Sequence, residues 1–152
     1  MVGLATRKKH VMAEPTTPPE GYLGRHVLLE LYDCDAELLK FPPDSKRILL
    51  AAAEAMGATV IGSHFHAFPE HGVSGVVVIA ESHLTVHTWP EFGYAAVDVF
   101  SCGVLDLEAG IAALVQDYGA GSIERRTVKR GLGAALSERH PAKRSPSAPT
   151  DR

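Results

Sequence analysis

Residues 72–103, GVSGVVVIAESHLTVHTWPEFGYAAVDVFSCG, contain three apolar stretches separated by two short connections. Residues 74–80, 84–89 and 94–100 are rich in β-branched and aromatic side chains, which favour β-strands. Connections of only a few residues join antiparallel neighbours, because parallel strands need a long crossover. The stretch therefore predicts the centre of an antiparallel sheet.

The flanking sequence predicts more strands and two helices. Residues 26–32, 59–68 and 122–129 have the composition of strands. A first helix is expected to begin at Asp44 or Ser45 as the N-cap and to end at Met56. A second helix is expected from Asp106, with Leu107, Ile111, Leu114, Val115 and Tyr118 on its buried face.

Two amphipathic helices beside an antiparallel sheet predict an α+β fold. We expect a two-layer α/β sandwich, with both helices on one face of the sheet. The other face needs a cover, and dimerisation through it is the expected solution for a chain of 152 residues.

The domain is predicted to cover residues 22–130. Residues 1–21 are proline-rich and predict a disordered leader, and residues 131–152 predict a flexible basic tail. Residues 125–152 carry eight Lys/Arg against two acids, so the rest of the chain holds a balance of −9 within a net charge of −3. A basic tail of this kind is usually solvated, so no nucleic-acid partner is expected.

Other classes of protein are disfavoured by composition. No apolar stretch approaches the roughly 18 to 20 residues that span a bilayer, so no membrane association is expected. Two cysteines do not make a disulfide framework, and we expect a cytoplasmic protein with free thiols.

Ser82 is the residue with the most unusual potential chemistry. A serine between two strands is most often a turn residue whose hydroxyl bonds local backbone. If the turn strains the Glu81–Ser82 amide, however, the hydroxyl can attack the preceding carbonyl and form an ester. β-Elimination would then break the chain and leave a pyruvoyl group at the new end.

The histidines allow two interpretations. His87 can serve as a proton-transfer group at neutral pH without a metal. His83 and His87 are four residues apart, and His64, His66 and His71 lie upstream, so a zinc site is a rival on spacing alone. No Cys-x-x-Cys or carboxylate–His pattern supports zinc, and no metal is expected.

Cys102 and three aromatic residues complete the candidates. The Cys102 thiol is a small apolar group or a proton donor, whereas Cys34 lies between two acids that would raise its pKa, so we interpret it as structural. Phe68, Trp89 and Phe92 are core residues or a platform for a flat or cationic ligand. Glu91 is a turn carboxylate or a partner for sugar hydroxyls.

Taken together, these residues resemble a known family. Residues 72–103, with GRHVLLELYDCD at 24–35 and GATVIGSHFHAF at 57–68, closely resemble the prokaryotic S-adenosylmethionine decarboxylases of the small pyruvoyl-dependent class. The resemblance spans the predicted domain, and ESHLTVHTWPE is its most specific part. Ala80 and Phe92 are modest departures from the family pattern.

The resemblance implies a role for each reactive residue. The proenzyme would cut itself between Glu81 and Ser82, and Ser82 would become the pyruvoyl group that forms a Schiff base with substrate. His87 would be the proton acceptor in processing, assisted by Ser74, and Cys102 would be the proton donor in catalysis. The cut would give fragments 1–81 and 82–152.

The resemblance also implies a substrate and an assembly. The positions that line the substrate pocket correspond to Phe68, Leu84, Trp89 and Glu91. The reaction would convert S-adenosylmethionine to S-adenosyl-3-(methylthio)propylamine and CO2 for spermidine biosynthesis, in a homodimer of cleaved protomers with both chains contributing to each site. A pyruvoyl-dependent arginine decarboxylase is the alternative enzyme. A histidine-rich binding module and a nucleic-acid binder remain alternatives outside enzymes.

Overall fold

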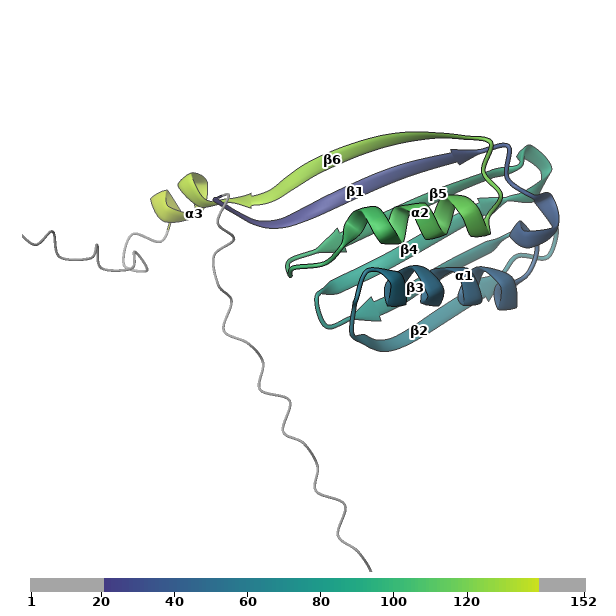
Figure 1. Cartoon of the computed structure of the whole chain (residues 1–152), viewed down its shortest axis with the longest axis horizontal. Helices are drawn as coiled ribbons and strands as arrows, with labels where there is room; N and C mark the ends of the chain where they lie inside the picture. Colours follow the sequence, from purple (N-terminus) through teal and green to yellow (C-terminus); the bar gives the residue numbers. More distant parts are fainter. Residues whose placement is uncertain (1–20, 140–152) are drawn as a thin grey trace, which may run out of the picture.

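The computed structural model describes residues 21–139. Two principal helices, a short third helix and a sheet make up this part of the chain (Figure 1). In chain order the elements are β1 (Tyr22–Tyr32), η1 (Ala36–Leu39), α1 (Pro42–Ala55), β2 (Val60–Ala67), β3 (Val73–Ile79), β4 (Ser82–Trp89), η2 (Pro90–Phe92), β5 (Tyr94–Ser101), α2 (Leu107–Asp117), β6 (Ser122–Leu132) and α3 (Gly133–Arg139).

The sheet confirms the predicted fold class. Its strand order in the described residues is β2-β3-β4-β5-β1-β6, and every neighbouring pair is antiparallel. Helices α1 and α2 lie side by side across one face of the sheet (Figure 1). The arrangement is a two-layer sandwich, and within residues 21–139 no helix layer covers the second face of the sheet.

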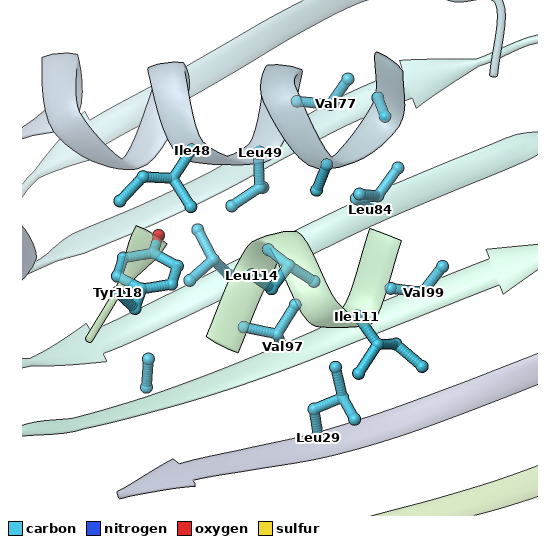
Figure 2. Packing of buried hydrophobic residues seen from close by; sticks show 14 of the residues in the cluster. Leu29, Ile48, Leu49, Val77, Leu84, Val97, Val99, Ile111, Leu114 and Tyr118 are labelled. Carbon is cyan, nitrogen blue, oxygen red and sulfur yellow. The ribbon is translucent and has the colours of Figure 1, made fainter. Parts of the chain in front are cut away.

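The core lies between the two helices and the sheet. Alternate residues of β3, β4, β5 and β1 point toward the helices and are fully buried, because side chains alternate between the two faces of a strand. These side chains meet the apolar stripes of the helices (Figure 2); the labelled members are Leu29, Ile48, Leu49, Val77, Leu84, Val97, Val99, Ile111, Leu114 and Tyr118. Burial of each large aliphatic side chain contributes about 1.5–3 kcal/mol.

The two helices begin differently from one another. Asp106 is the N-cap of α2 as predicted, and its carboxylate accepts a hydrogen bond of 3.0 Å from the N–H of Ala109. The predicted N-cap of α1 at Asp44 or Ser45 is wrong, because α1 begins at Pro42. Proline suits the first turn of a helix, where its missing N–H would have no partner.

The outer strands are longer than the sequence predicts. β1 begins at Tyr22 rather than His26, and β6 continues to Leu132, because the two strands pair along this extension with Tyr22 opposite Leu132. Part of the expected flexible tail is therefore strand and the helix α3. Residues 1–20 and 140–152, which include most of the predicted leader and tail, lie outside the described residues. Among the described helices, none is both long and apolar enough to cross a bilayer.

Candidate active site

The turn between β3 and β4 contains the predicted cleavage bond. Ile79 pairs with Ser82 across this turn, and Ala80 and Glu81 form its tip. Thr59 holds both tip residues: its carbonyl accepts from the Ala80 N–H at 2.8 Å, and its N–H donates to Glu81 Oε2 at 3.1 Å. The segment that precedes the Glu81–Ser82 amide is therefore held against Thr59.

Ser82 has a backbone conformation that residues with side chains rarely adopt. Its φ angle is +147°. A residue other than glycine held in a sparsely populated region stores about 1–3 kcal/mol and persists only where its surroundings impose it. The strain falls on the residue whose preceding amide is the predicted cleavage bond.

The carbonyl of that amide accepts two hydrogen bonds from one residue. The Cys102 N–H donates to the Glu81 oxygen at 2.9 Å, and the Cys102 thiol donates to the same oxygen at 3.0 Å. The pairing of Ser82 with Ser101 at the end of β5 brings the next residue, Cys102, beside the turn. Two donors on one carbonyl oxygen are the arrangement that stabilises negative charge developing there.

Cys34, in contrast, has no such environment. Its side chain is buried, and burial, followed by the charge of Asp33, raises its pKa to about 11. The direction agrees with the interpretation from sequence, although burial is the larger cause. A thiol held protonated in the core has a structural role.

His83 lies closest to the Ser82 hydroxyl. Ser82 Oγ and His83 Nδ1 are 3.2 Å apart. Burial and the neighbouring His26 lower the pKa of His83, and the carboxylate of Asp98 opposes them. The sequence offered His83 only as a zinc ligand, so its contact with the serine is a feature that sequence reasoning missed.

Ser74 and His87 form a second pair on the same two strands. They lie opposite each other in the register of β3 and β4, and Ser74 Oγ is 2.9 Å from His87 Nδ1. The pair lies five residues from Ser82 along β4, which corresponds to about 16 Å of extended strand. Within one chain, His87 is therefore not beside the Ser82 hydroxyl.

The second pair belongs to an aromatic surface on the sheet face away from the helices. The exposed residues His87 and Trp89 alternate with the buried residues Val86 and Thr88, so His87 and Trp89 point away from the core. The ring of Trp89 lies 5.3 Å from that of Tyr94. Phe68 follows β2 at the same end of the sheet and is 49% exposed, and Trp89 is 40% exposed.

The candidate pocket residues Glu91 and Leu84 differ in their exposure to solvent. Glu91 lies in η2 directly after Trp89 and Pro90 and is exposed, as a ligand-binding carboxylate must be. Leu84 is fully buried in the core on the opposite face of the sheet. The Leu84 side chain therefore points away from the aromatic surface, and the assignment of the Leu84 position to a substrate pocket stays a prediction.

We refer to residues Glu81, Ser82, His83 and Cys102 as the cleavage end, and to Phe68, Ser74, His87, Trp89 and Glu91 as the aromatic end.

The zinc alternative gains no support from either end. Within residues 21–139, no group of three or more His, Cys, Asp or Glu side chains is arranged to hold a metal ion.

The family model for S-adenosylmethionine decarboxylase matches residues 25–131, which include both ends of the site. The chain belongs to this family. A relative from Thermodesulfovibrio yellowstonii, an S-adenosylmethionine decarboxylase proenzyme, is 45% identical over 122 residues, which cover 80% of this chain and 90% of the relative.

Other members of the family support the same assignment. The S-adenosylmethionine decarboxylase proenzyme of Thermosipho africanus is 58% identical over 81 residues, which cover 53% of this chain and 62% of that protein. The crystal structure of the adenosylmethionine decarboxylase from Aquifex aeolicus superposes with a TM-score of 0.68 at 35% identity, covering 73% of this chain and 92% of that one. Family and fold therefore agree.

Proposed function

We propose that this chain is a proenzyme that cuts itself between Glu81 and Ser82 and then decarboxylates S-adenosylmethionine to S-adenosyl-3-(methylthio)propylamine and CO2 for spermidine biosynthesis. The observation that supports it most strongly is the positive φ of Ser82 beside a carbonyl with two donors. Its two thiols are free, in keeping with the reduced cytoplasm where we expect it to act.

The first step of self-cleavage uses groups that are already in contact. The Ser82 Oγ bonds to the Glu81 carbonyl carbon, the C–N bond breaks, and the chain continues through an ester with a free amine on Ser82. The N–H and thiol of Cys102 stabilise the negative oxygen that forms during the attack. Relief of the strain at Ser82 favours this step.

The second step breaks the chain. A base removes the Cα proton of Ser82, and the Glu81 carboxylate leaves from the β-carbon. Water then adds, ammonia is released, and residue 82 ends as a pyruvoyl group. The sequence of steps consumes one water, releases one ammonia, and needs no oxidant.

The residues around Ser82 fit this group, because its precursor is hydrogen-bonded at the preceding carbonyl and at its own hydroxyl. A pyruvoyl group supplies a carbonyl that binds the substrate amine and accepts the electrons released with CO2. Once the chain is cut, we expect Cys102 to return a proton to the carbon that lost CO2. Protonation elsewhere would consume the group, so the site needs an acid at this position.

A complete site requires two copies of the chain. The cleavage end and the aromatic end lie about 16 Å apart along one strand, yet the proposed roles of Ser82, Ser74 and His87 need them together. In a twofold dimer, residue i of one copy contacts residue j of the other and j contacts i, so the cleavage end of each copy can meet the aromatic end of its partner. We propose such a homodimer, formed through the sheet face that carries no helix.

The aromatic end suits the proposed substrate. The exposed faces of Phe68 and Trp89 can stack on an adenine ring or lie against the cationic sulfonium. Glu91 can accept hydrogen bonds from ribose hydroxyls. Arginine, the alternative substrate, would offer neither an adenine nor a ribose to these residues.

Intact mass spectrometry of the purified protein tests the proposal. We expect fragments that end at Glu81 and begin at residue 82, the second without a free amine. The protein should then release labelled CO2 from S-adenosylmethionine and not from arginine. A chain that is folded, uncut and inactive would refute the proposal, and CO2 from arginine alone would establish the alternative.

A further inference from the structure

His83 contacts the reacting hydroxyl but has no part in the steps above. Neighbouring side chains of a regular strand point to opposite faces, so Ser82 and His83 would normally diverge. The positive φ of Ser82 interrupts the strand at this point, and its Oγ lies 3.2 Å from His83 Nδ1. The same distortion that strains the amide therefore brings the hydroxyl to an imidazole.

A row of rings across three strands supports His83. The Phe100 ring on β5 lies 5.6 Å from that of His83 and 5.3 Å from that of His26 on β1, and the two imidazoles are 6.2 Å apart. The rings pack edge to face or tilted, which limits rotation of the His83 ring. The Arg130 guanidinium on β6 lies 5.6 Å from the Phe100 centroid.

Arg130 holds the His26 ring at the end of this row. Arg130 Nη1 is 3.1 Å from His26 Nδ1, and an arginine can only donate, so Nδ1 must be the acceptor. His26 Nε2 is buried and has no hydrogen-bond partner among the described residues. The His26 ring is therefore held from one side by Arg130 and packed on the other against Phe100 and His83.

His83 is therefore held as a neutral base. The groups that face it are His26 and Phe100, Asp98 on β5, and the apolar Val78 opposite it on β3. Burial and His26 outweigh the carboxylate and lower the pKa of His83, so its unprotonated form predominates at neutral pH.

We propose that His83 is the base of the first step of self-cleavage, acting within its own chain. As the Ser82 Oγ bonds to the Glu81 carbon, the hydroxyl proton moves to the lone pair of His83 Nδ1. The imidazolium then gives that proton to the departing Ser82 nitrogen, so His83 ends the step unchanged. His26, Phe100 and Arg130 are positioning residues for this base.

This inference rests on the proposed function, and it divides the work between two histidines. His83 serves the attack by the hydroxyl, for which it is already in contact. His87, about 16 Å away in its own chain, is left for the removal of the Cα proton after a second copy brings it to the site. The two histidines should therefore fail at different chemical stages.

The test compares His83→Asn and His83→Ala with the wild type in a cell-free translation time course of cleavage. An asparagine amide can hydrogen-bond the Ser82 hydroxyl but cannot take its proton, so His83→Asn separates a base from a group that only orients. We expect both variants to cut about 10² to 10⁴ times more slowly than the wild type. His64→Asn, a change of another exposed histidine on the sheet, is the matched control and should cut normally.

Hydroxylamine identifies the stage at which each variant stops. It cleaves esters and spares amides, so uncut His83→Asn chain should resist it, whereas uncut His87→Ala chain should be split between residues 81 and 82. The cleavage rate of the wild type should fall at acidic pH, because His83 becomes protonated. The slow residual cleavage of His83→Asn should not show this fall.

Cleavage of His83→Asn within about threefold of the wild-type rate would overturn the inference, because a base contributes at least ~10²-fold. A hydroxylamine-sensitive bond in that variant would do the same. If circular dichroism shows that His83→Ala does not fold, the cleavage rate of His83→Asn alone tests whether His83 is the base. A wild-type chain that is never cut would refute the proposed function instead.

Discussion

The two ends of strands β3 and β4 differ in what they bring to the site. At the cleavage end, the Ser82 hydroxyl contacts an imidazole and the Glu81 carbonyl accepts two hydrogen bonds, all within one chain. The aromatic end presents exposed rings and the Ser74–His87 pair, but no bond to break. We therefore propose that the first end carries out the reaction and that the second end binds the substrate.

The comparison shows that the strained backbone and the exposed aromatic side chains lie at opposite ends of these two strands. The positive φ of Ser82 is imposed by a turn that Thr59 and Cys102 hold with hydrogen bonds. The exposed rings lie on the sheet face that no helix of the described residues covers, and we propose that a ligand and a second copy contact them there. Changes at the two ends should therefore have separable effects.

Ser82→Ala should have the largest effect. It removes the nucleophile, so we expect no cleavage and no decarboxylation, with the full-length chain as the only species in intact mass spectrometry. Ser63→Ala, an exposed serine on β2, is the matched control and should be cut like the wild type. Any fragment ending at Glu81 in the Ser82→Ala protein would contradict the role of the hydroxyl.

Cys102→Ala should separate cleavage from turnover. The backbone N–H of residue 102 still donates to the Glu81 oxygen, so loss of the thiol should slow cleavage by about 10²-fold without stopping it. Decarboxylation by the cut protein should fall by about 10²- to 10⁴-fold, because the proposed acid is missing. Rates are measured by gel densitometry and by labelled CO2.

Cys34→Ala is the control for the thiol. It should leave both rates unchanged and lower only the melting temperature, because Cys34 is buried in the core. Normal turnover in Cys102→Ala would remove the thiol from the mechanism.

Leu84→Ala and Trp89→Ala should act on different quantities, although the residues are five apart on β4. Leu84→Ala opens a cavity in the core and should lower the free energy of unfolding by about 2–5 kcal/mol, with KM unchanged in the folded protein. Trp89→Ala should change stability little and raise KM by about tenfold, or about 1.4 kcal/mol of binding energy. Urea unfolding and steady-state kinetics measure the two effects, and a raised KM in Leu84→Ala would support a contact between Leu84 and the substrate.

The smallest expected effect is a dependence of stability on pH. The pKa of His83 is lower in the folded chain than in the unfolded one, so the unfolded chain binds more protons at acidic pH. The contribution is fully present above about pH 6.5 and is lost as pH falls through the folded pKa. Urea unfolding of wild type and His83→Asn between about pH 7.5 and 5.5 should show a weaker decline in the variant; equal slopes would assign the decline to other groups.

The sequence predicts the layers of the fold better than the ends of its elements. The alternation in residues 72–103 indicates three neighbouring strands, and all three are present. The start of α1 was missed because Asp44 and Ser45 are good N-caps, whereas the proline at Pro42 already suits the first turn. The extension of β1 and β6 depends on their pairing with each other, which no local pattern reveals.

The sequence could predict which residues belong to the candidate site, but not their contacts or backbone conformation. The motif around Ser82 indicates the cleavage bond, and the structure adds the positive φ and the two donors of Cys102, which depend on the register of β4 with β5. Alternation alone could have predicted that the Leu84 side chain faces the core, since Leu84 shares the inward face of β4 with Val86. The contact of His83 with Ser82 breaks that alternation, so sequence reasoning could not find it.

The relation between the two ends can be measured most directly in mixed dimers. Chains carrying Ser82→Ala and His87→Ala are co-expressed with different tags, and dimers that hold one of each are purified. Neither variant alone should be cut. If the ends meet across two copies, the His87→Ala chain of the mixed dimer is cut, because its intact Ser82 meets the His87 of the other chain. A mixed dimer in which both chains stay whole, or His87→Ala protein that cuts itself at the wild-type rate, would contradict the account.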